Sequence, residues 1–150
     1  MESIAMSRRK IILDCDPGHD DAIAILMALA SPEKLDLLGL TCVGGNVSLD
    51  MTSKNALKVC ELAGFTDTAV HSGCERPMIR QLSTAENVHG KSGLDLPGGT
   101  VLPEPTMSLR PQHAVDFIID TLMMESTQSI TLCPTGPLTN IAMAMIREPK

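Results

Sequence analysis

Short, continuously apolar runs alternate along the chain with longer segments of helix-forming residues, and Gly, Pro and polar residues separate the two. Apolar runs such as residues 35–43 are typical of strands that are covered on both faces of a sheet. The longer segments have the length and the start signals of helices. The expected elements, in order, are a strand over 10–13, a helix from about 20 to 30, a strand over 35–43, a helix over 50–62, a strand over 69–71, a helix over 111–125, a strand over 129–133 and a helix over 138–147.

This strand–helix alternation predicts an α/β fold, a doubly wound, mostly parallel, Rossmann-like sheet with helices on both faces. Residues 1–9 show no such pattern, and we expect them to form a disordered N-terminal extension to the portion of one domain that spans 10–150. The connection over 73–109 has little periodicity. Long connections of this kind are often functional, so its polar, glycine-flanked part at 86–93 is a candidate lid.

Small and polar residues follow each expected strand. They are an acidic segment over 14–21, Gly44-Gly45-Asn46, Ser72-Gly73, and Pro134-Thr135-Gly136. The carboxyl ends of parallel strands meet at one edge of the sheet, and ligands of such sheets bind there. We therefore expect a functional site at that edge.

Four aspartates lie close together at the end of the first expected strand: Asp14, Asp16, Asp20 and Asp21. Two like charges about 4 Å apart repel by roughly 1 kcal/mol in water and by about 4 kcal/mol at an effective dielectric near 20. A single aspartate here has an ordinary explanation, Asp20 as a helix cap or Asp14 as a turn residue. Four together favour a hard divalent cation, which prefers oxygen ligands.

Other metal and phosphate sites fit this segment less well. An EF-hand loop that began at Asp14 would have Ile25 at its twelfth position, where a glutamate is needed. No Gly-Lys-Ser/Thr sequence follows a strand, so a phosphate-binding loop is not indicated. A haloacid-dehalogenase-type phosphatase also begins with strand-Asp-x-Asp, but there Gly-Thr or Gly-Val follows, whereas here Pro17 and Gly18 do. That phosphatase remains the alternative enzyme class.

Charge and composition limit the classes of molecule that this protein is expected to bind. The net charge is −6 and aromatic residues make up 1% of the chain, which argues against a nucleic acid polymer and favours a small molecule. No apolar run approaches the roughly 20 residues of a membrane helix, and no secretory signal is visible, so we expect no membrane partner and a cytoplasmic protein. The five cysteines form no Cys-x-x-Cys pair and are expected to be reduced.

The run over 11–22 closely resembles the N-terminal signature of the inosine–uridine-type nucleoside hydrolases, Asp-x-Asp-Pro-Gly-x-Asp-Asp. Segments 43–46, 87–93 and 134–140 resemble the same family in the same order, so the likeness runs from about residue 10 to 150. Within the family, the chain looks nearest to the pyrimidine-preferring bacterial ribonucleoside hydrolases. The resemblance implies hydrolysis of the N-glycosidic bond of ribonucleosides to ribose and free base.

The resemblance also implies a calcium site. Asp16 and Asp21 would ligate Ca²⁺ with help from the main-chain carbonyl of Thr135, and Asp16 would be the general base that deprotonates the attacking water. Asp14 would lie behind the ligands and orient its neighbours. N-glycosidic cleavage passes through an oxocarbenium-like state, which anionic carboxylates stabilise.

Three further residues are assigned to the substrate by the same resemblance. Asp20 and Asn46 would hold ribose hydroxyls, and His89 would lie near the base in a mobile loop. His19, inside the aspartate motif, is expected to be structural.

Family members are about twice this length, and the resemblance places a further metal-ligating aspartate and a catalytic histidine in their C-terminal half. We therefore expect either a truncated chain, which is inactive alone or a non-catalytic remnant, or a sequence that continues beyond residue 150. Half of a doubly wound sheet would leave an apolar strand edge uncovered, so we also expect a homo-oligomer.

Overall fold

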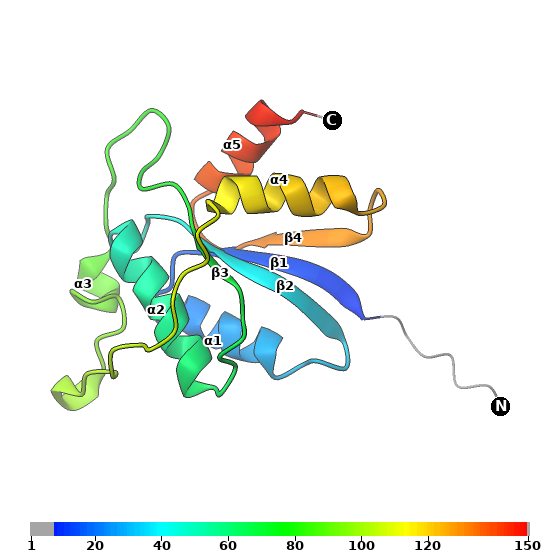
Figure 1. Cartoon of the computed structure of the whole chain (residues 1–150). Coiled ribbons are helices and arrows are strands. Elements are labelled where there is room, and N and C mark those ends of the chain that lie inside the picture. Colours follow the sequence, from blue (N-terminus) through cyan, green and yellow to red (C-terminus); the bar gives the residue numbers. More distant parts are fainter. Residues whose placement is uncertain (1–7, 150) are drawn as a thin grey trace.

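Four parallel strands form the centre of the computed structural model, which describes residues 8–149 (Figure 1). Their order across the sheet is β3-β2-β1-β4. The strands are β1 (Arg9–Cys15), β2 (Leu35–Cys42), β3 (Val70–Ser72) and β4 (Ile130–Pro134). Most of the extension expected at residues 1–9 lies outside the described residues. Arg9, however, already belongs to β1, because its amide donates to the carbonyl of Lys34 (2.8 Å) and it pairs with Leu35.

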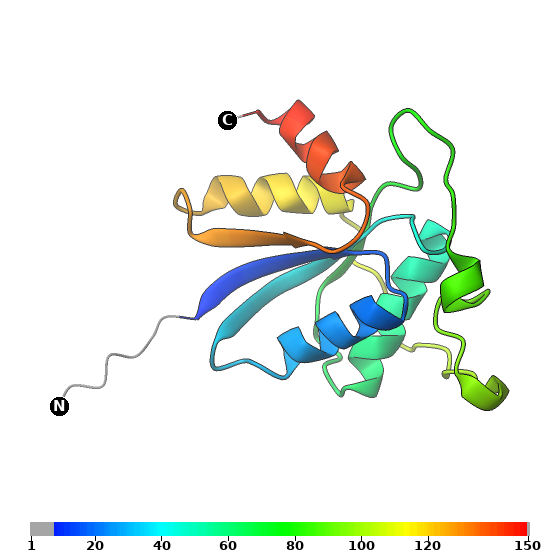
Figure 2. The same cartoon turned by 180° about the vertical axis from the view of Figure 1, so that it is seen from behind.

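Helices cover both faces of the sheet, as expected of a doubly wound fold. They are α1 (His19–Leu29), α2 (Leu49–Leu62), the one-turn α3 (Glu86–His89), α4 (Ala114–Met124) and α5 (Thr139–Arg147), with a 3-10 turn at Pro97–Gly99. The sheet separates α1 and α2 from α4 and α5 in both views (Figures 1 and 2). Between residues 8 and 149, none of these helices has the length and apolar character needed to span a membrane.

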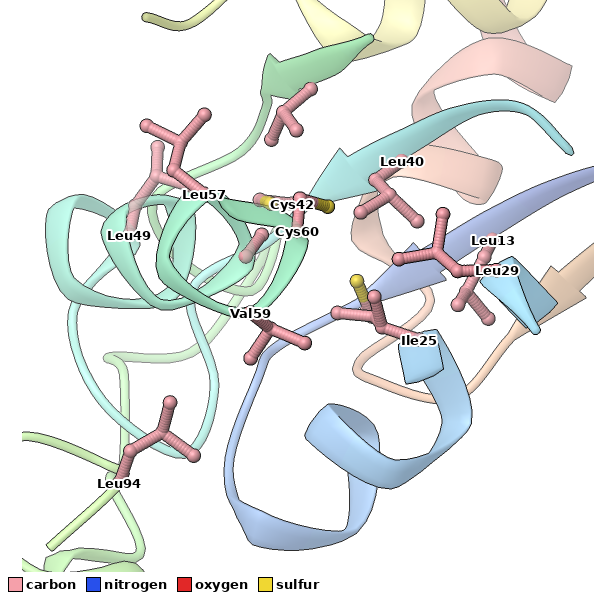
Figure 3. Packing of buried hydrophobic residues seen from close by; sticks show 13 residues of the cluster. Leu13, Ile25, Leu29, Leu40, Cys42, Leu49, Leu57, Val59, Cys60 and Leu94 are labelled. Carbon is pink, nitrogen blue, oxygen red and sulfur yellow. The ribbon is translucent and has the colours of Figure 1, made fainter. Parts of the chain in front are cut away.

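The larger core lies between the sheet and the helices α1 and α2. Leu13, Leu40 and Cys42 of the central strands pack against Ile25 of α1 and Cys60 of α2 (Figure 3). Figure 3 also shows Leu94 from the long connection at the margin of this cluster. All five cysteines are free, and three of them are fully buried in this part of the molecule, as small hydrophobic residues.

The opposite face has a smaller core. Ile12 of β1 packs against Val115 and Ile118 of α4 and Ala144 of α5. Residues of β4 are at most half-buried, and between α4, β4 and α5 an apolar groove remains open. The sheet is thus sealed on one face and only partly covered on the other.

A β-bulge in the pairing of β1 with β2 determines which residue of β2 lies opposite Asp14. Ile11 pairs with Leu37, but the next residue, Ile12, pairs with Gly39, so β2 carries one extra residue. Such a bulge changes which residues face each other in the rest of the ladder. Beyond it, Asp14 lies opposite Thr41.

The connection between β3 and α4 is held to the rest of the molecule at several points. The amide of Ala85 donates to the carbonyl of Asn46 (2.8 Å), and Asn55 donates to the carbonyl of Ser92 (2.8 Å). Farther along, the carboxylate of Glu61 accepts from the amides of Thr106 and Met107. These contacts place the candidate lid beside the carboxyl ends of the strands.

Candidate functional site

The loops that follow the four strands meet at one edge of the sheet, beside α3 and the long connection (Figure 2). This is the edge at which the sequence predicts a site. Three of the four aspartates of the motif are buried there, with exposed fractions of 0% for Asp14, 6% for Asp16 and 3% for Asp21.

The side chain of Asp14 is fully buried, and the residue stands one position before the end of β1. Its Oδ1 accepts hydrogen bonds from the hydroxyl of Thr41 (2.6 Å) and the side-chain amide of Asn140 (2.8 Å). Its Oδ2 is the one buried side-chain oxygen or nitrogen without a hydrogen-bond partner in residues 8–149. Burial raises the pKa of Asp14 above its usual value, against the lowering effect of the two donors and with a contribution from the charge of Asp21.

Asp16 is enclosed by two glycines. Its Oδ2 accepts from the amide of Asn46 (2.7 Å), and a Cβ at Gly45 or at Gly136 would overlap the carboxylate. Only glycine therefore fits at these two positions while the carboxylate keeps its place. Burial, together with the negative charge of Asp21, raises the pKa of Asp16 to about 7.

Asp21 faces inward from the first turn of α1, and its Oδ2 accepts from the main-chain amide of Asp16 (2.8 Å). The helix forms here because Pro17-Gly18 ends the strand and acidic residues favour the positive end of the helix dipole. Asp20 precedes it in the same turn but is exposed. Successive helical residues point in different directions, so only one of the two joins the buried carboxylates.

The loop after β4 lies directly against this cluster. The amide of Thr135 donates to the carbonyl of Asp14 (2.8 Å), and its hydroxyl lies 3.3 Å from the same oxygen. Thr135 itself is exposed, and the next residue, Gly136, borders the carboxylate of Asp16. The structure thus brings Asp16, Asp21 and the Thr135 main chain to one place.

Asn46 and His89 reach the same loop from two other elements. The side-chain nitrogen of Asn46 donates to the carbonyl of Asp16 (2.9 Å). His89, half-buried at the end of α3, accepts at Nδ1 from the amide of His19 (3.3 Å), and the two imidazole rings lie 5.5 Å apart. Gly18 has no Cβ, and the ring of His89 occupies the space where one would lie.

The chemistry of these groups suits calcium but supplies only part of its coordination. The two buried carboxylates of Asp16 and Asp21 are hard oxygen donors, and Asp14 has one carboxylate oxygen without a hydrogen-bond partner. In the described part of the chain, no group of three or more His, Cys, Asp or Glu residues is arranged to hold a metal ion. Calcium takes 6–8 oxygen ligands, so the other ligands of a calcium ion at this place would have to come from outside these residues.

Four residues of the site were given no role of their own from the sequence, although three of them lie in the segments named there: Thr41, Asn140, Gly45 and Gly136. Thr41 is the one polar residue in the last part of an otherwise apolar strand, and that isolated position is a usable signal. Asn140 follows a strand and begins a helix, a place where a polar residue is commonly a local cap. Its contact with Asp14, 126 residues away, has no local signature.

A family model for the inosine-uridine preferring nucleoside hydrolases matches residues 11–150 of this chain. The chain belongs to this family. The match includes the aspartate motif, Asn46, His89 and the Thr135 loop, and it leaves the phosphatase alternative without support.

Individual nucleoside hydrolases agree with the family match. The chain is 51% identical over 144 residues to the pyrimidine-specific ribonucleoside hydrolase RihB of Escherichia coli, covering 96% of this chain and 44% of RihB. It is 50% identical over 137 residues to RihA of Photobacterium profundum, covering 91% of this chain and 43% of RihA. The solved purine-preferring ribonucleoside hydrolase of Gardnerella vaginalis superposes with a TM-score of 0.84 at 34% identity, covering 94% of this chain and 44% of that structure. The chain therefore spans less than half the length of these relatives.

Proposed function

We propose that the gene product carrying these residues hydrolyses the N-glycosidic bond of ribonucleosides to ribose and free base. The observation that carries the proposal is the burial of Asp14, Asp16 and Asp21 side by side at the carboxyl edge of the sheet, in a family motif. The names of the relatives, both pyrimidine-specific and purine-preferring ribonucleoside hydrolases, support the substrate class.

The carboxylates of Asp16 and Asp21 and the main-chain carbonyl of Thr135 would hold Ca²⁺. When bound, calcium supplies a fixed positive charge that orients ribose hydroxyls and makes a neighbouring water easier to deprotonate. The buried carboxylates are the reason to expect a cation, because like charges that are withdrawn from water need a compensating positive charge.

The roles of this chain's own side chains are those that the family resemblance implies, and their positions are compatible with them. Asp16 takes the proton of the attacking water, while its neighbours Gly45 and Gly136 keep the carboxylate in one place. Asn46, which is bonded to Asp16, and Asp20, exposed at the start of α1, are assigned to ribose hydroxyls. His89 is assigned to the base end of the substrate by the same resemblance, and its contact with the amide of His19 puts it beside the aspartate motif.

Calcium binding is tested with two isosteric variants. We expect Asp16→Asn and Asp21→Asn each to remove bound calcium from the complete gene product and nearly all of its turnover, because each deletes a charged oxygen ligand. Asp50→Asn is the matched control, since Asp50 is an exposed aspartate in the first turn of another helix, α2. Elemental analysis that shows full calcium in either site variant would contradict the assignment.

The reaction is tested with uridine, 2′-deoxyuridine and an aryl phosphate. Hydrogen bonds to ribose hydroxyls that strengthen in the transition state are lost with the hydroxyl, so we expect deoxyuridine to react at least about a hundredfold more slowly. Reducing sugar and inorganic phosphate are measured. Equal rates on the two nucleosides would contradict the ribose roles of Asp20 and Asn46. Phosphate release without sugar would support the phosphatase, and no release of either would support a non-catalytic remnant.

A further inference from the structure

Two buried donors, Thr41 and Asn140, hold the carboxylate of Asp14, and neither contacts the predicted calcium ligands through its own side chain. We propose that both are positioning residues, which fix Asp14 and through it the two calcium-binding segments around Asp16 and Thr135. The inference rests on the proposed function for the identity of the ion. It adds residues that shape the site from the interior of the sheet.

The side chain of Asn140 has one possible orientation. Its Nδ2 donates to Asp14 Oδ1 (2.8 Å) and to the carbonyl of Cys42 (3.0 Å), while its Oδ1 accepts from the amide of Cys74 (2.8 Å). The side chain of Asn140 is fully buried, and a Cβ added at Gly73 would overlap it. From the start of α5, this one amide therefore ties together the end of β2, the loop after β3 and the Asp14 carboxylate of β1.

Thr41 approaches Asp14 from the neighbouring strand. The two residues are opposite each other in the register of β1 and β2, and the Thr41 hydroxyl donates to Asp14 Oδ1 over 2.6 Å. Both residues are 0% exposed. Because water cannot replace either donor, loss of one leaves the buried carboxylate with a single partner on Oδ1 and none on Oδ2.

The main chain of Asp14 carries this constraint to the site. Its carbonyl accepts from the amides of Thr135 (2.8 Å) and Gly136 (3.4 Å), and Gly136 borders the Asp16 carboxylate. Asp16 itself follows two residues later in the chain. A shift of Asp14 thus moves both the carboxylate of Asp16 and the loop of Thr135, which together supply two of the proposed ligands.

The test compares two fully buried threonines that bond different partners, Thr41 on β2 and Thr52 on α2. Thr41→Val removes the donor to Asp14 at nearly constant volume. Thr52→Val is the matched control: Thr52 is equally buried, but its hydroxyl bonds the carbonyls of Val43 and Leu49 (3.0 Å each). Thr41→Ser restores the hydroxyl. Thermal unfolding without calcium verifies that each variant folds.

Calcium chloride is titrated calorimetrically into the complete gene product and its variants, and amide hydrogen exchange is followed at Thr135 and Gly136. We expect Thr41→Val and Asn140→Ala to weaken calcium binding by about 10- to 100-fold, the usual effect of losing a partner behind a ligand, and to speed exchange at both amides. Thr52→Val and Thr41→Ser should bind calcium within about twofold of the unchanged chain, because the contact to Asp14 is intact.

Unchanged affinity and exchange in Thr41→Val, or an equal loss in Thr52→Val, would overturn the positioning role. If the unchanged complete gene product binds no calcium at all, the metal of the proposed function is contradicted. The exchange rates at Thr135 and Gly136 then still decide whether Thr41 and Asn140 hold this loop in place.

Discussion

The two edges of the sheet are built differently. At the β3 edge the returning chain covers the strand: the amide of Arg110 donates to the carbonyl of Val70 (2.8 Å), and Arg110 pairs with His71. At the β4 edge, β1 pairs with one side of Ile130–Pro134, and no strand in residues 8–149 pairs with the other side. The apolar groove between α4 and α5 lies beside β4. An uncovered edge and an exposed apolar surface both invite association with another chain.

One part of the fold stabilises the chain through its core, and another part exposes an apolar surface to which a further chain can bind. The face of the sheet that α1 and α2 cover contains the larger core, which includes the β1 residues Leu13 and Cys15 on either side of Asp14. The open side exposes apolar residues such as Met123, Met124 and Met145, whose exposed fractions are 57%, 86% and 66%. The chain spans 44% of RihB, so the relatives have ample further sequence that could cover such a surface.

Core truncation should show the largest contrast between the two sides. Leu40 lies opposite Val70 and is 0% exposed, whereas Leu132 of β4 is only half-buried. We expect Leu40→Ala to lower the free energy of unfolding by about 2–5 kcal/mol and Leu132→Ala by about 1 kcal/mol or less, because the second site leaves a smaller cavity. Denaturant titration of both variants measures this, and equal costs would show that the β4 side is as well packed as the β3 side.

Removing one main-chain donor should open the covered edge. Arg110→Pro deletes the amide that bonds Val70, and we expect it to cost about 1–3 kcal/mol and to increase aggregation. Arg110→Ala retains the amide and serves as the control. Unfolding and light scattering are measured together. If Arg110→Ala destabilises as much as Arg110→Pro, the side chain rather than the backbone bond protects this edge.

Charges on the open side should reduce self-association. We expect the isolated chain to associate through the β4 side, and Met123→Lys with Met145→Lys to weaken that association at least about tenfold, since both apolar side chains would be replaced by charges. The control pair is Ile23→Lys with Met27→Lys on α1, which are equally exposed but lie on the sealed face. Sedimentation velocity across a concentration series gives the result, and a stable monomer before any substitution would contradict the expectation.

The smallest effect concerns pH at the covered edge. His71 is 4% exposed and stacks on Phe117 with ring centroids 4.0 Å apart. Burial lowers the pKa of His71 below its ordinary 6.5, partly opposed by the contact with the carbonyl of Gln112. The unfolded chain therefore binds a proton first, so stability should fall as pH drops below 6.5 and be unaffected above it.

His71→Gln should flatten that part of the profile of unfolding free energy against pH. Between pH 7 and 9 the two proteins should run parallel, since His71 is neutral there in both the folded and the unfolded chain. An unchanged slope below pH 6.5 in the variant would assign the pH dependence to other groups.

Local patterns predicted the strands and the main helices well, because strand burial and helix starts are encoded within a few residues. Boundaries differed where a side chain capped a helix: α4 begins at Ala114 and not at Pro111, because the His113 ring accepts from the amide of Val115 (3.2 Å). The one-turn helix at Glu86–His89 was not expected at all, since four residues give no periodic signal.

The site divides in the same way. The aspartate motif and the segments that resemble the family are continuous in sequence and could be found there. The burial of Asp21 beside an exposed Asp20 depends on how α1 packs. The bonds from Thr41 and Asn140 to Asp14 depend on strand register and on contacts across 27 and 126 residues, which no local pattern records.

The extra residue in β2 has a consequence for insertions and deletions. With uninterrupted pairing from Ile11 and Leu37 onward, Asp14 would face Leu40, and the Thr41 hydroxyl would move one place along. Deleting Leu38 would remove the extra residue and leave Asp14 opposite Thr41. Deleting Leu40 instead would place Cys42 opposite Asp14 and take the hydroxyl donor away from a buried carboxylate. Length variation in β2 should thus be acceptable before the bulge and strongly selected against between the bulge and Cys42.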